Sequence, residues 1–268
     1  MGKITYIRTD FGELVDVRHE RLDAVVPDGI TSIGIHAFNG ARDMLVSITM
    51  PDSLKRIASE ACYCLTNLTH VELGNNLEYI GTDAFNSCGL IEVSIPDSVT
   101  DTGSGVFSNC FDLKSVRLSN NLREISCGMF RFCRNLKEVV IPDSVQVIGK
   151  SAFQDCKSLQ RIVLGKNVTS IDDLAFYYDK NLVQVELPDS LVSIGMGAFA
   201  ECTALERLVI PAGVNRIHPD AFSRCTALKQ LVLKREFKKD IIRSWDLPET
   251  CAIVYEKENN DEKENNNE

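Results

Sequence analysis

One stretch of the chain reads Ile141-Pro-Asp-Ser-Val-Gln-Val-Ile-Gly-Lys-Ser-Ala-Phe-Gln-Asp-Cys-Lys-Ser-Leu-Gln-Arg-Ile-Val163, and the same pattern starts again at Leu164. On both sides of this stretch the pattern recurs at intervals of 22 to 24 residues, mostly 23, over most of the 268 residues. A fixed period of this length indicates a repeat architecture with one structural unit per period. Nine full repeats open at Val26, Met50, Leu73, Ile95, Leu118, Ile141, Leu164, Leu187 and Ile210, and Leu233 follows the ninth.

Each position of the repeat has a physical interpretation. Leu159, Ile162 and Leu164 have the spacing of inward-facing residues on a short strand. Pro142 ends such a strand, because proline has no amide hydrogen to donate to a sheet. A residue type that occurs once per repeat stacks on its own copies when the repeats stack. Phenylalanine does so in eight repeats, at Phe38, Phe85, Phe107, Phe130, Phe153, Phe176, Phe199 and Phe222.

One repeat cannot bury its apolar face alone, so neighbouring repeats must share one continuous core. The strands of successive repeats then run parallel, about 4.8 Å apart. We therefore predict a solenoid with strands along one side and irregular segments along the other.

The pattern L-x-x-I-x-L-P-x-S-V-x-x-I-G-x-x-A-F-x-x-C, present over residues 22 to 233, resembles the BspA-type (treponemal-class) leucine-rich repeat. The resemblance implies an α/β-type solenoid, a right-handed leucine-rich-repeat superhelix with 23-residue repeats and a concave parallel β-sheet. The better-known members of this family are surface proteins of bacteria and protists that bind host proteins or other cells.

Two departures from strict repetition are visible. Openings with Pro-Asp-Ser alternate with openings such as Gly-Asn-Asn, which indicates duplication of a two-repeat unit and carries no functional information. Thr102 stands in a column of isoleucines, in the most glycine-rich repeat, and we expect a locally loose coil there.

The ends of a solenoid expose its core and need caps. We expect an N-terminal β-hairpin cap over residues 1–25, nine leucine-rich repeats over 26–233, a C-terminal cap over 234–255 and a disordered acidic tail over 256–268. The only tryptophan, Trp245, is expected in the core of the C-terminal cap.

The composition excludes several partners. A net charge of -9 and a pI near 5.1 argue against nucleic acid and anionic membranes, which require a basic surface. The sequence has no stretch of 18 apolar residues, so we expect no membrane insertion. The first 25 residues lack a secretory signal. A native start at Met1 therefore favours a cytoplasmic, reducing location, whereas the family resemblance favours the cell surface or secretion.

The residues offer no catalytic chemistry, and we expect neither enzyme activity nor a cofactor. The four histidines fall at unrelated repeat positions, and no nucleophile–base pair or phosphate loop is apparent. No set of residues has the spacing of a metal site. Six of the ten cysteines share one repeat column, and we interpret them as small buried apolar residues instead of disulfide partners. They are Cys88, Cys110, Cys133, Cys156, Cys202 and Cys225.

The outward residues of the strands are the informative positions, because the fold leaves them free. In the C-terminal half they combine valine with arginine, as the centres of protein interfaces do. Valine also suits a sheet surface for reasons of packing alone. The candidate contacts are Val140, Val163, Val209 and Val232, with Arg161, Arg207 and Glu186 setting the register of the partner.

These positions favour a non-catalytic scaffold for protein–protein interaction, with a partner that the sequence does not identify. A cell-surface adhesin that binds a host protein or a glycan is the alternative. The glycan reading predicts a row of exposed aromatic residues, and the outward strand columns contain none.

Overall fold

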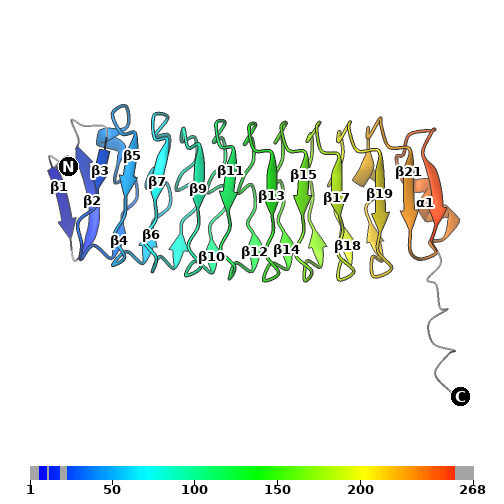
Figure 1. Ribbon diagram of the computed structural model, residues 1–268, viewed down its shortest axis with the longest axis horizontal. Coiled ribbons are helices and arrows are strands. Elements are labelled where there is room, and N and C mark those ends of the chain that lie inside the picture. The colour runs from blue at the N-terminus through cyan, green and yellow to red at the C-terminus, as the bar shows by residue number, and fades with distance from the viewer. Residues whose placement is uncertain (1–5, 11, 19–22, 257–268) are drawn as a thin grey trace, which may run out of the picture.

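The computed structural model describes residues 6–10, 12–18 and 23–256. The chain winds into a rod of coils that lie side by side from the N-terminal to the C-terminal end (Figure 1). Successive coils pair in parallel with a step of one repeat, so that Val139 lies opposite Ile162 and Ile162 opposite Val185. The predicted solenoid with a parallel sheet is therefore confirmed.

One row of strands carries the outward residues named above, and we call its outer surface the strand face. The ladder of this row is divided into four groups, β3–β5–β7, β9–β11, β13–β15–β17 and β19–β21–β22. Its members are β3 (Asp23–Val25), β5 (Ser47–Thr49), β7 (His70–Glu72), β9 (Glu92–Ser94), β11 (Ser115–Arg117), β13 (Glu138–Val140), β15 (Arg161–Val163), β17 (Gln184–Glu186), β19 (Arg207–Ile210), β21 (Gln230–Leu233) and β22 (Ala252–Tyr255).

A second row of two-residue strands lies below the first in Figure 1, where the sequence predicted irregular segments. In the described coils these strands replace the helices of other solenoids, and helical structure is limited to η1 (Asn39–Ala41), η2 (Pro219–Phe222) and α1 (Lys239–Ser244). The second row comprises β4 (Ser32–Ile33), β6 (Arg56–Ile57), β8 (Tyr79–Ile80), β10 (Asp101–Thr102), β12 (Glu124–Ile125), β14 (Val147–Ile148), β16 (Ser170–Ile171), β18 (Ser193–Ile194) and β20 (Arg216–Ile217).

The phenylalanine column forms a continuous stack inside the rod. From Phe85 to Phe222 successive rings are nearly parallel, with centroids 5.2 to 6.1 Å apart. All eight rings are fully buried. Burial of one such side chain stabilises the fold by about 1.5–3 kcal/mol, and each stacked pair adds about 0.5–1.5 kcal/mol. The stack therefore contributes to the stability of every coil that it passes through.

The cysteine column lies beside this stack and has a role beyond filling space. Each thiol donates a hydrogen bond, 3.0 to 3.2 Å long, to the carbonyl oxygen of the phenylalanine-column residue one coil before it. Cysteine is thus a small apolar side chain that still satisfies a buried acceptor. Asp179 occupies this column in the seventh repeat and is fully buried.

The third side of the rod consists of the turns between a short strand and the next strand of the strand face. Each turn has one or two residues in the left-handed conformation, and most of them are not glycine. This side carries the residues that flank each buried cysteine, such as Phe132 and Arg134 around Cys133.

Both ends of the rod carry additional elements. The strands β1 (Tyr6–Asp10) and β2 (Glu13–Arg18) pair antiparallel, and β2 continues in parallel with β4. At the other end Trp245 is buried, as expected, and packs edge-on against Phe237 with ring centroids 5.3 Å apart. The division into caps, nine repeats and tail stays a prediction, and residues 257–268 of the expected tail lie outside the described residues.

The row of short strands is divided at the repeat that contains Thr102. Backbone pairing runs from β4 to β10 and again from β12 to β20. Across the junction the Thr102 hydroxyl donates to the hydroxyl of Ser126 at 3.0 Å, and Ser126 donates to the carbonyl oxygen of Gly103 at 2.7 Å. Side chains thus bridge two coils where the backbone ladder stops. The looseness of this coil stays a prediction.

Candidate functional site

Two of the four candidate valines form an apolar pair on the strand face. Val140 at the end of β13 lies directly opposite Val163 at the end of β15. Val140 is 58% exposed and Val163 is half-buried. The inward neighbours Val139 and Ile162 are buried, so the alternation of the strand holds the pair on a rigid sheet.

The other two valines are less accessible than the sequence suggested. Val209 is half-buried, and Val232 is only 3% exposed. Val232 lies between Val209 and Val254, because β21 pairs in parallel with both β19 and β22. The prediction that Val232 contacts a partner was therefore wrong. The closing strand β22 continues the sheet beside β21 and gives Val232 a neighbour on its second side.

The three charged candidates have polar neighbours on the same surface. Arg161 forms an ion pair with Glu138 across β13 and β15. The Nε of Arg207 donates to the side-chain oxygen of Gln230 at 2.9 Å. Glu186 accepts a hydrogen bond from Gln184 at 3.0 Å. All three candidates keep an accessible polar end beside the valines.

A shallow hollow gathers three of the candidates. It has a volume of about 490 Å³ and lies between β17 and β19, where the ladder of the strand face is interrupted. Glu186, Arg207 and Val209 line it together with Gln184 and Lys234. Val140 and Val163 lie on the neighbouring strands β13 and β15 and do not line this hollow.

The N-terminal half of the strand face is more polar. One of its hollows, of about 580 Å³, is lined by Glu72, Ser94, Asp97 and Arg117 among others. The Arg117 guanidinium is not free, because its Nη2 donates to both carboxylate oxygens of Asp97 at 3.0 Å. Its Nη1 donates to the carbonyl oxygen of Ile95 at 3.0 Å.

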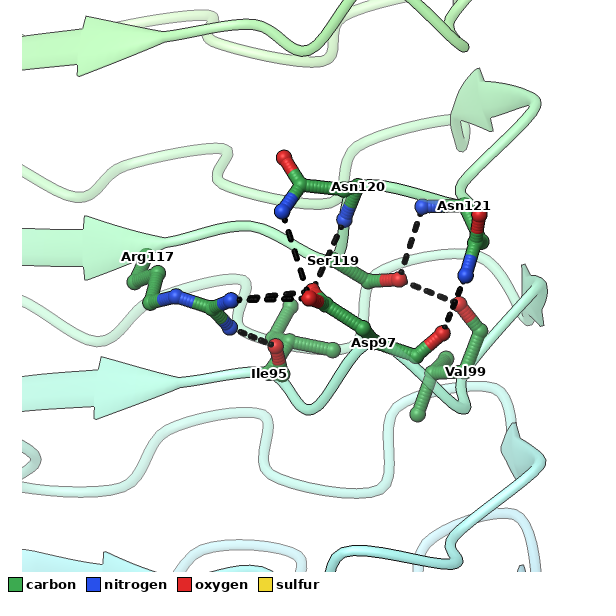
Figure 2. Close-up of polar contacts among 7 residues, drawn as sticks. All are labelled: Ile95, Asp97, Val99, Arg117, Ser119, Asn120 and Asn121. Atoms are coloured by element: carbon green, nitrogen blue, oxygen red, sulfur yellow. Dashed lines mark hydrogen bonds and ion pairs between the residues drawn. The ribbon is translucent and has the colours of Figure 1, made fainter.

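Figure 2 shows that Asp97 is the centre of a larger cluster. Its carboxylate also accepts from the backbone N–H of Asn120 at 3.0 Å, and its carbonyl oxygen accepts from the side chain of Asn121 at 2.7 Å. Hydrogen bonds from Asn120, and then from Arg117, lower the pKa of Asp97. We call this arrangement a clasp. In a clasp, an aspartate of one repeat accepts hydrogen bonds from residues that open the next repeat.

Clasps recur with the two-repeat rhythm seen in the sequence. Asp52 accepts from the backbone N–H of Asn75 at 2.7 Å, and Asp143 accepts from that of Lys166 at 2.9 Å. Asn76 and Asn167 supply the side-chain bond to the carbonyl oxygen of the aspartate at 3.0 and 2.8 Å. The alternation of Pro-Asp-Ser and Asn-rich openings therefore has a structural cause, namely hydrogen bonding between paired repeats.

The remaining chemistry of the described residues is structural. No group of three or more His, Cys, Asp or Glu in this part of the chain could hold a metal ion. Burial raises the pKa of the column thiols, to about 12 for Cys110 and Cys225. Thiols of such high pKa are poor nucleophiles at neutral pH, because the thiolate is the reactive form.

The third side carries residues that sequence reasoning passed over. Arg134 lies over the rings of Phe111 and Phe132, and Lys157 and Lys180 lie over the ring of Tyr178. The signal was present in the sequence, since Arg134, Lys157 and Lys180 are spaced by one repeat. The outward strand columns, from which the candidate contacts were predicted, do not contain these residues.

One family model matches most of the chain. A model described as the BspA type leucine rich repeat region, with six copies, matches residues 31–160 and 147–244. No curated protein matches the chain. None of the helices in the described part is long and apolar enough to cross a membrane.

Two solved structures with TM-scores above 0.5 share the architecture. A leucine-rich-repeat protein from T. pallidum is 28% identical, with 72% of this chain and 82% of that chain covered and a TM-score of 0.53. One from Eubacterium ventriosum is 21% identical, with 67% and 58% covered and a TM-score of 0.57. A leucine-rich cell surface protein from Faecalibacterium prausnitzii is 19% identical, with 93% and 94% covered and a TM-score of 0.45.

Proposed function

The chain belongs to the BspA-type leucine-rich-repeat family, and we propose that it is a non-catalytic scaffold that binds a protein partner through the C-terminal half of its strand face. We define this half by Val140, Val163, Val209, Arg161, Arg207 and Glu186. Stacked columns fix the backbone, so that only the outward side chains differ in what they can bind.

The exposed apolar pair Val140–Val163 carries the proposal. An exposed valine has no part in the core of this coil, which the inward residues of the same strands already form. Apolar side chains at the centre of a patch, surrounded by polar groups, are typical of protein interfaces. Because the sheet is rigid, a partner that docks on it loses less binding energy to ordering of this surface.

The polar groups around the pair would select the partner. Arg161, Arg207 and Glu186 present both signs of charge on three neighbouring strands. Complementary charges at the edge of an interface contribute mainly to specificity and association rate. The hollow beside Glu186 and Arg207 offers a place for one protruding side chain of the partner.

The non-catalytic part of the proposal rests on the shape of the hollows on the strand face and on the hydrogen bonds of the charged side chains that line them. The hollows described on the strand face are shallow and open, and charged side chains that line them are bonded to neighbours, Arg117 to Asp97 and Arg207 to Gln230. Catalytic groups are usually placed in concave, water-excluding sites with strongly perturbed pKa values.

The same scaffold suits two settings. At the cell surface, where better-known family members act, the partner would be a host protein or a glycan, and the chain would be an adhesin. In a reducing compartment the column of free thiols would be preserved. Protease treatment of intact cells followed by detection of the chain distinguishes the two locations.

The test compares two variants of equal chemistry. Val140→Glu places a charge in the centre of the candidate surface, whereas Ile35→Glu places it on another side at a residue that is 63% exposed. Both should fold, since surface substitutions usually change stability by no more than about 0.5 kcal/mol. We expect pull-downs with the wild type and with Ile35→Glu to recover a protein that Val140→Glu does not recover.

Two outcomes contradict the proposal. If the wild type, Val140→Glu and Ile35→Glu all recover the same proteins, this half of the strand face is not the binding surface. If the purified chain turns over a substrate, and a substitution on the strand face abolishes this activity, the protein is an enzyme and the scaffold proposal is wrong.

A further inference from the structure

A column of three cations runs along the third side of the rod. Arg134, Lys157 and Lys180 occupy the same position of the fifth, sixth and seventh repeats, two residues before the buried leucine that precedes the strand-face segment of each repeat. Neighbouring coils are separated by about 5 Å, so these side chains lie close enough to repel one another. An arrangement of this kind is stabilised by anions.

Aromatic rings fix the direction of the cations. The Arg134 guanidinium carbon lies 5.2 Å from the centroid of Phe111 and 5.7 Å from that of Phe132. The Nζ atoms of Lys157 and Lys180 lie 5.3 and 4.1 Å from the centroid of Tyr178. Each such contact contributes about 0.5–1 kcal/mol at an exposed site. Held side chains lose less entropy on binding than free ones.

Two of these aromatic residues have an unfavourable backbone conformation. Phe132 has φ of 64° and Tyr178 has φ of 68°, in a column where other repeats carry Asn109, Asp155 or Glu201. Left-handed backbone is uncommon for bulky residues and more easily adopted by asparagine or aspartate. The fold alone does not require an aromatic side chain at these two positions.

The surrounding charges leave the column positive. Asp155 is almost fully buried and lies 3.0 Å from Arg134 and 3.6 Å from Lys157, so that one carboxylate serves two cations. Arg131 adds a further cation over Phe132, at 4.6 Å. Glu201 is paired with Arg224 at 2.9 Å. This patch is therefore basic on a chain whose net charge is -9.

We propose that the third side of repeats 4–7 binds a linear sulfated glycan, with Arg134, Lys157 and Lys180 each contacting an anionic group. The proposal concerns a different side of the rod from the strand face and does not depend on the function proposed above. One cation per coil forms a straight row along the rod axis. A pyranose ring with its glycosidic linkage advances a glycan chain by close to the same step.

Two other linear anions fit less well. In an extended acidic peptide the side chains on one side recur every two residues, about 6.6 Å, which does not match the coil spacing. The third side also has no open strand edge to which such a peptide could add. Single-stranded nucleic acid needs free ring faces for base stacking, and here cations lie over the rings of Phe132 and Tyr178.

The experiment measures binding of heparin, a sulfated glycan, to the full chain by isothermal titration at low and at physiological salt. The triple variant Arg134→Gln, Lys157→Gln, Lys180→Gln removes the column. The matched control Lys55→Gln, Lys166→Gln, Lys229→Gln removes the same charge from other sides, where each lysine is in an exposed ion pair. Circular dichroism and thermal melting establish that both variants are folded.

We expect heparin to bind the wild type and the control within about twofold of each other, and the triple variant at least tenfold more weakly. Binding should weaken as salt rises, because the contacts are exposed ion pairs. Heparin that binds the triple variant as well as the wild type, or does not bind the wild type, overturns the proposal. So does tighter binding of polyglutamate or poly(U) RNA than of heparin. Val140→Glu should bind heparin normally, which separates this test from that of the strand face.

Discussion

The two central two-repeat units of the solenoid have the same design and differ at a few positions. The first unit, residues 95–140, and the second, residues 141–186, each open with Pro-Asp-Ser and each close a clasp, at Asp97 and at Asp143. Phenylalanine rings continue through both without interruption. Because the shared framework is constant, each difference between the units shows what one side chain contributes.

Inside the rod, the differences affect how the coils hold together. Ser119 of the first unit corresponds to Gly165 of the second, and Cys133 corresponds to Asp179. On the strand face, Arg117 of the first unit is bound by Asp97, whereas its counterpart Val163 forms an apolar pair with Val140. We infer that inward differences change stability, and that outward differences change what the molecule binds.

The largest effect is expected from Gly165→Ala. A β-carbon at Gly165 would lie 2.2 Å from the carbonyl oxygen of Pro142 and 2.6 Å from its carbon, both of which are backbone atoms. The coils would have to separate, at a cost of about 3 kcal/mol, the upper end of the usual range for overpacking. Urea unfolding measures the loss. A loss no larger than that of Ser119→Ala, which adds no β-carbon, would contradict this expectation.

The next effect depends on pH and concerns Asp179. Its Oδ1 accepts from the backbone N–H of Cys156 at 2.7 Å, and its Oδ2 has no partner among the described residues. Burial raises the pKa of Asp179 well above its ordinary value. As pH rises above about 4, the unfolded chain releases this proton and the folded chain retains it, so stability falls.

Asp179→Asn keeps the acceptor for Cys156 and removes the proton linkage. We expect the variant to be more stable than the wild type at pH 7, with a difference that shrinks on acidification and vanishes below about pH 4. The slope is at most about 1.4 kcal/mol per pH unit. Thermal melting between pH 3.5 and 8 gives the curve, and a difference that is independent of pH contradicts the assignment.

Asp97 of the first unit should show the opposite sign. Hydrogen bonds from Asn120 and Arg117 lower its pKa, so its contribution to stability is present above the ordinary carboxylate pKa and is lost as pH falls through the lowered value. Asp97→Asn should therefore be less stable than the wild type at pH 7 and approach it in acid. The two aspartates provide controls for each other in the same melting series.

A smaller loss is expected from Ser119→Ala. The buried hydroxyl of Ser119 donates to the carbonyl oxygen of Val99 at 2.6 Å and accepts from the backbone N–H of Asn121 at 3.1 Å (Figure 2). Its removal leaves a buried acceptor without this donor, which costs about 1–3 kcal/mol. Chemical unfolding of Ser119→Ala that matches the wild type would show that the clasp does not need this side chain.

The smallest effect is local and concerns the interrupted ladder. The amide of Gly149 donates to the carbonyl oxygen of Ile125 at 2.8 Å, whereas its counterpart Ser126 lies at the junction between β10 and β12, where pairing stops. We expect the Ser126 amide to exchange with solvent at least tenfold faster than that of Gly149. If the amides of Ser126 and Gly149 are equally protected in hydrogen-exchange measurements, the expectation of a loose coil around Thr102 is wrong.

The fold was predictable because its determinants repeat. A phenylalanine such as Phe153 has the same environment in eight coils, so the column indicates both burial and stacking without knowledge of any contact. The second row of short strands was not predictable in this way. Two residues per coil give too little alternation to distinguish a strand from an irregular turn.

The candidate site was predictable only where neighbouring coils are alike. Val140 and Val163 lie opposite each other, as their shared column requires. Val232 has the same position in its repeat but is buried beside β22, and the repeat pattern holds no information about the element that follows the last coil. The clasps depend on pairs of residues in different coils, which the pattern of a single repeat does not reveal, and the cation column lies outside the strand columns from which the contacts were predicted.

The most direct test of the account is a binding curve of the captured partner with the wild type, Val140→Glu and Ile35→Glu, each checked by thermal melting. We predict that Val140→Glu binds at least tenfold more weakly than the other two, while its Tm stays within about 2 °C of the wild type. Unchanged affinity in the folded Val140→Glu variant would contradict the claim that the outward residues in the C-terminal half of the strand face select the partner.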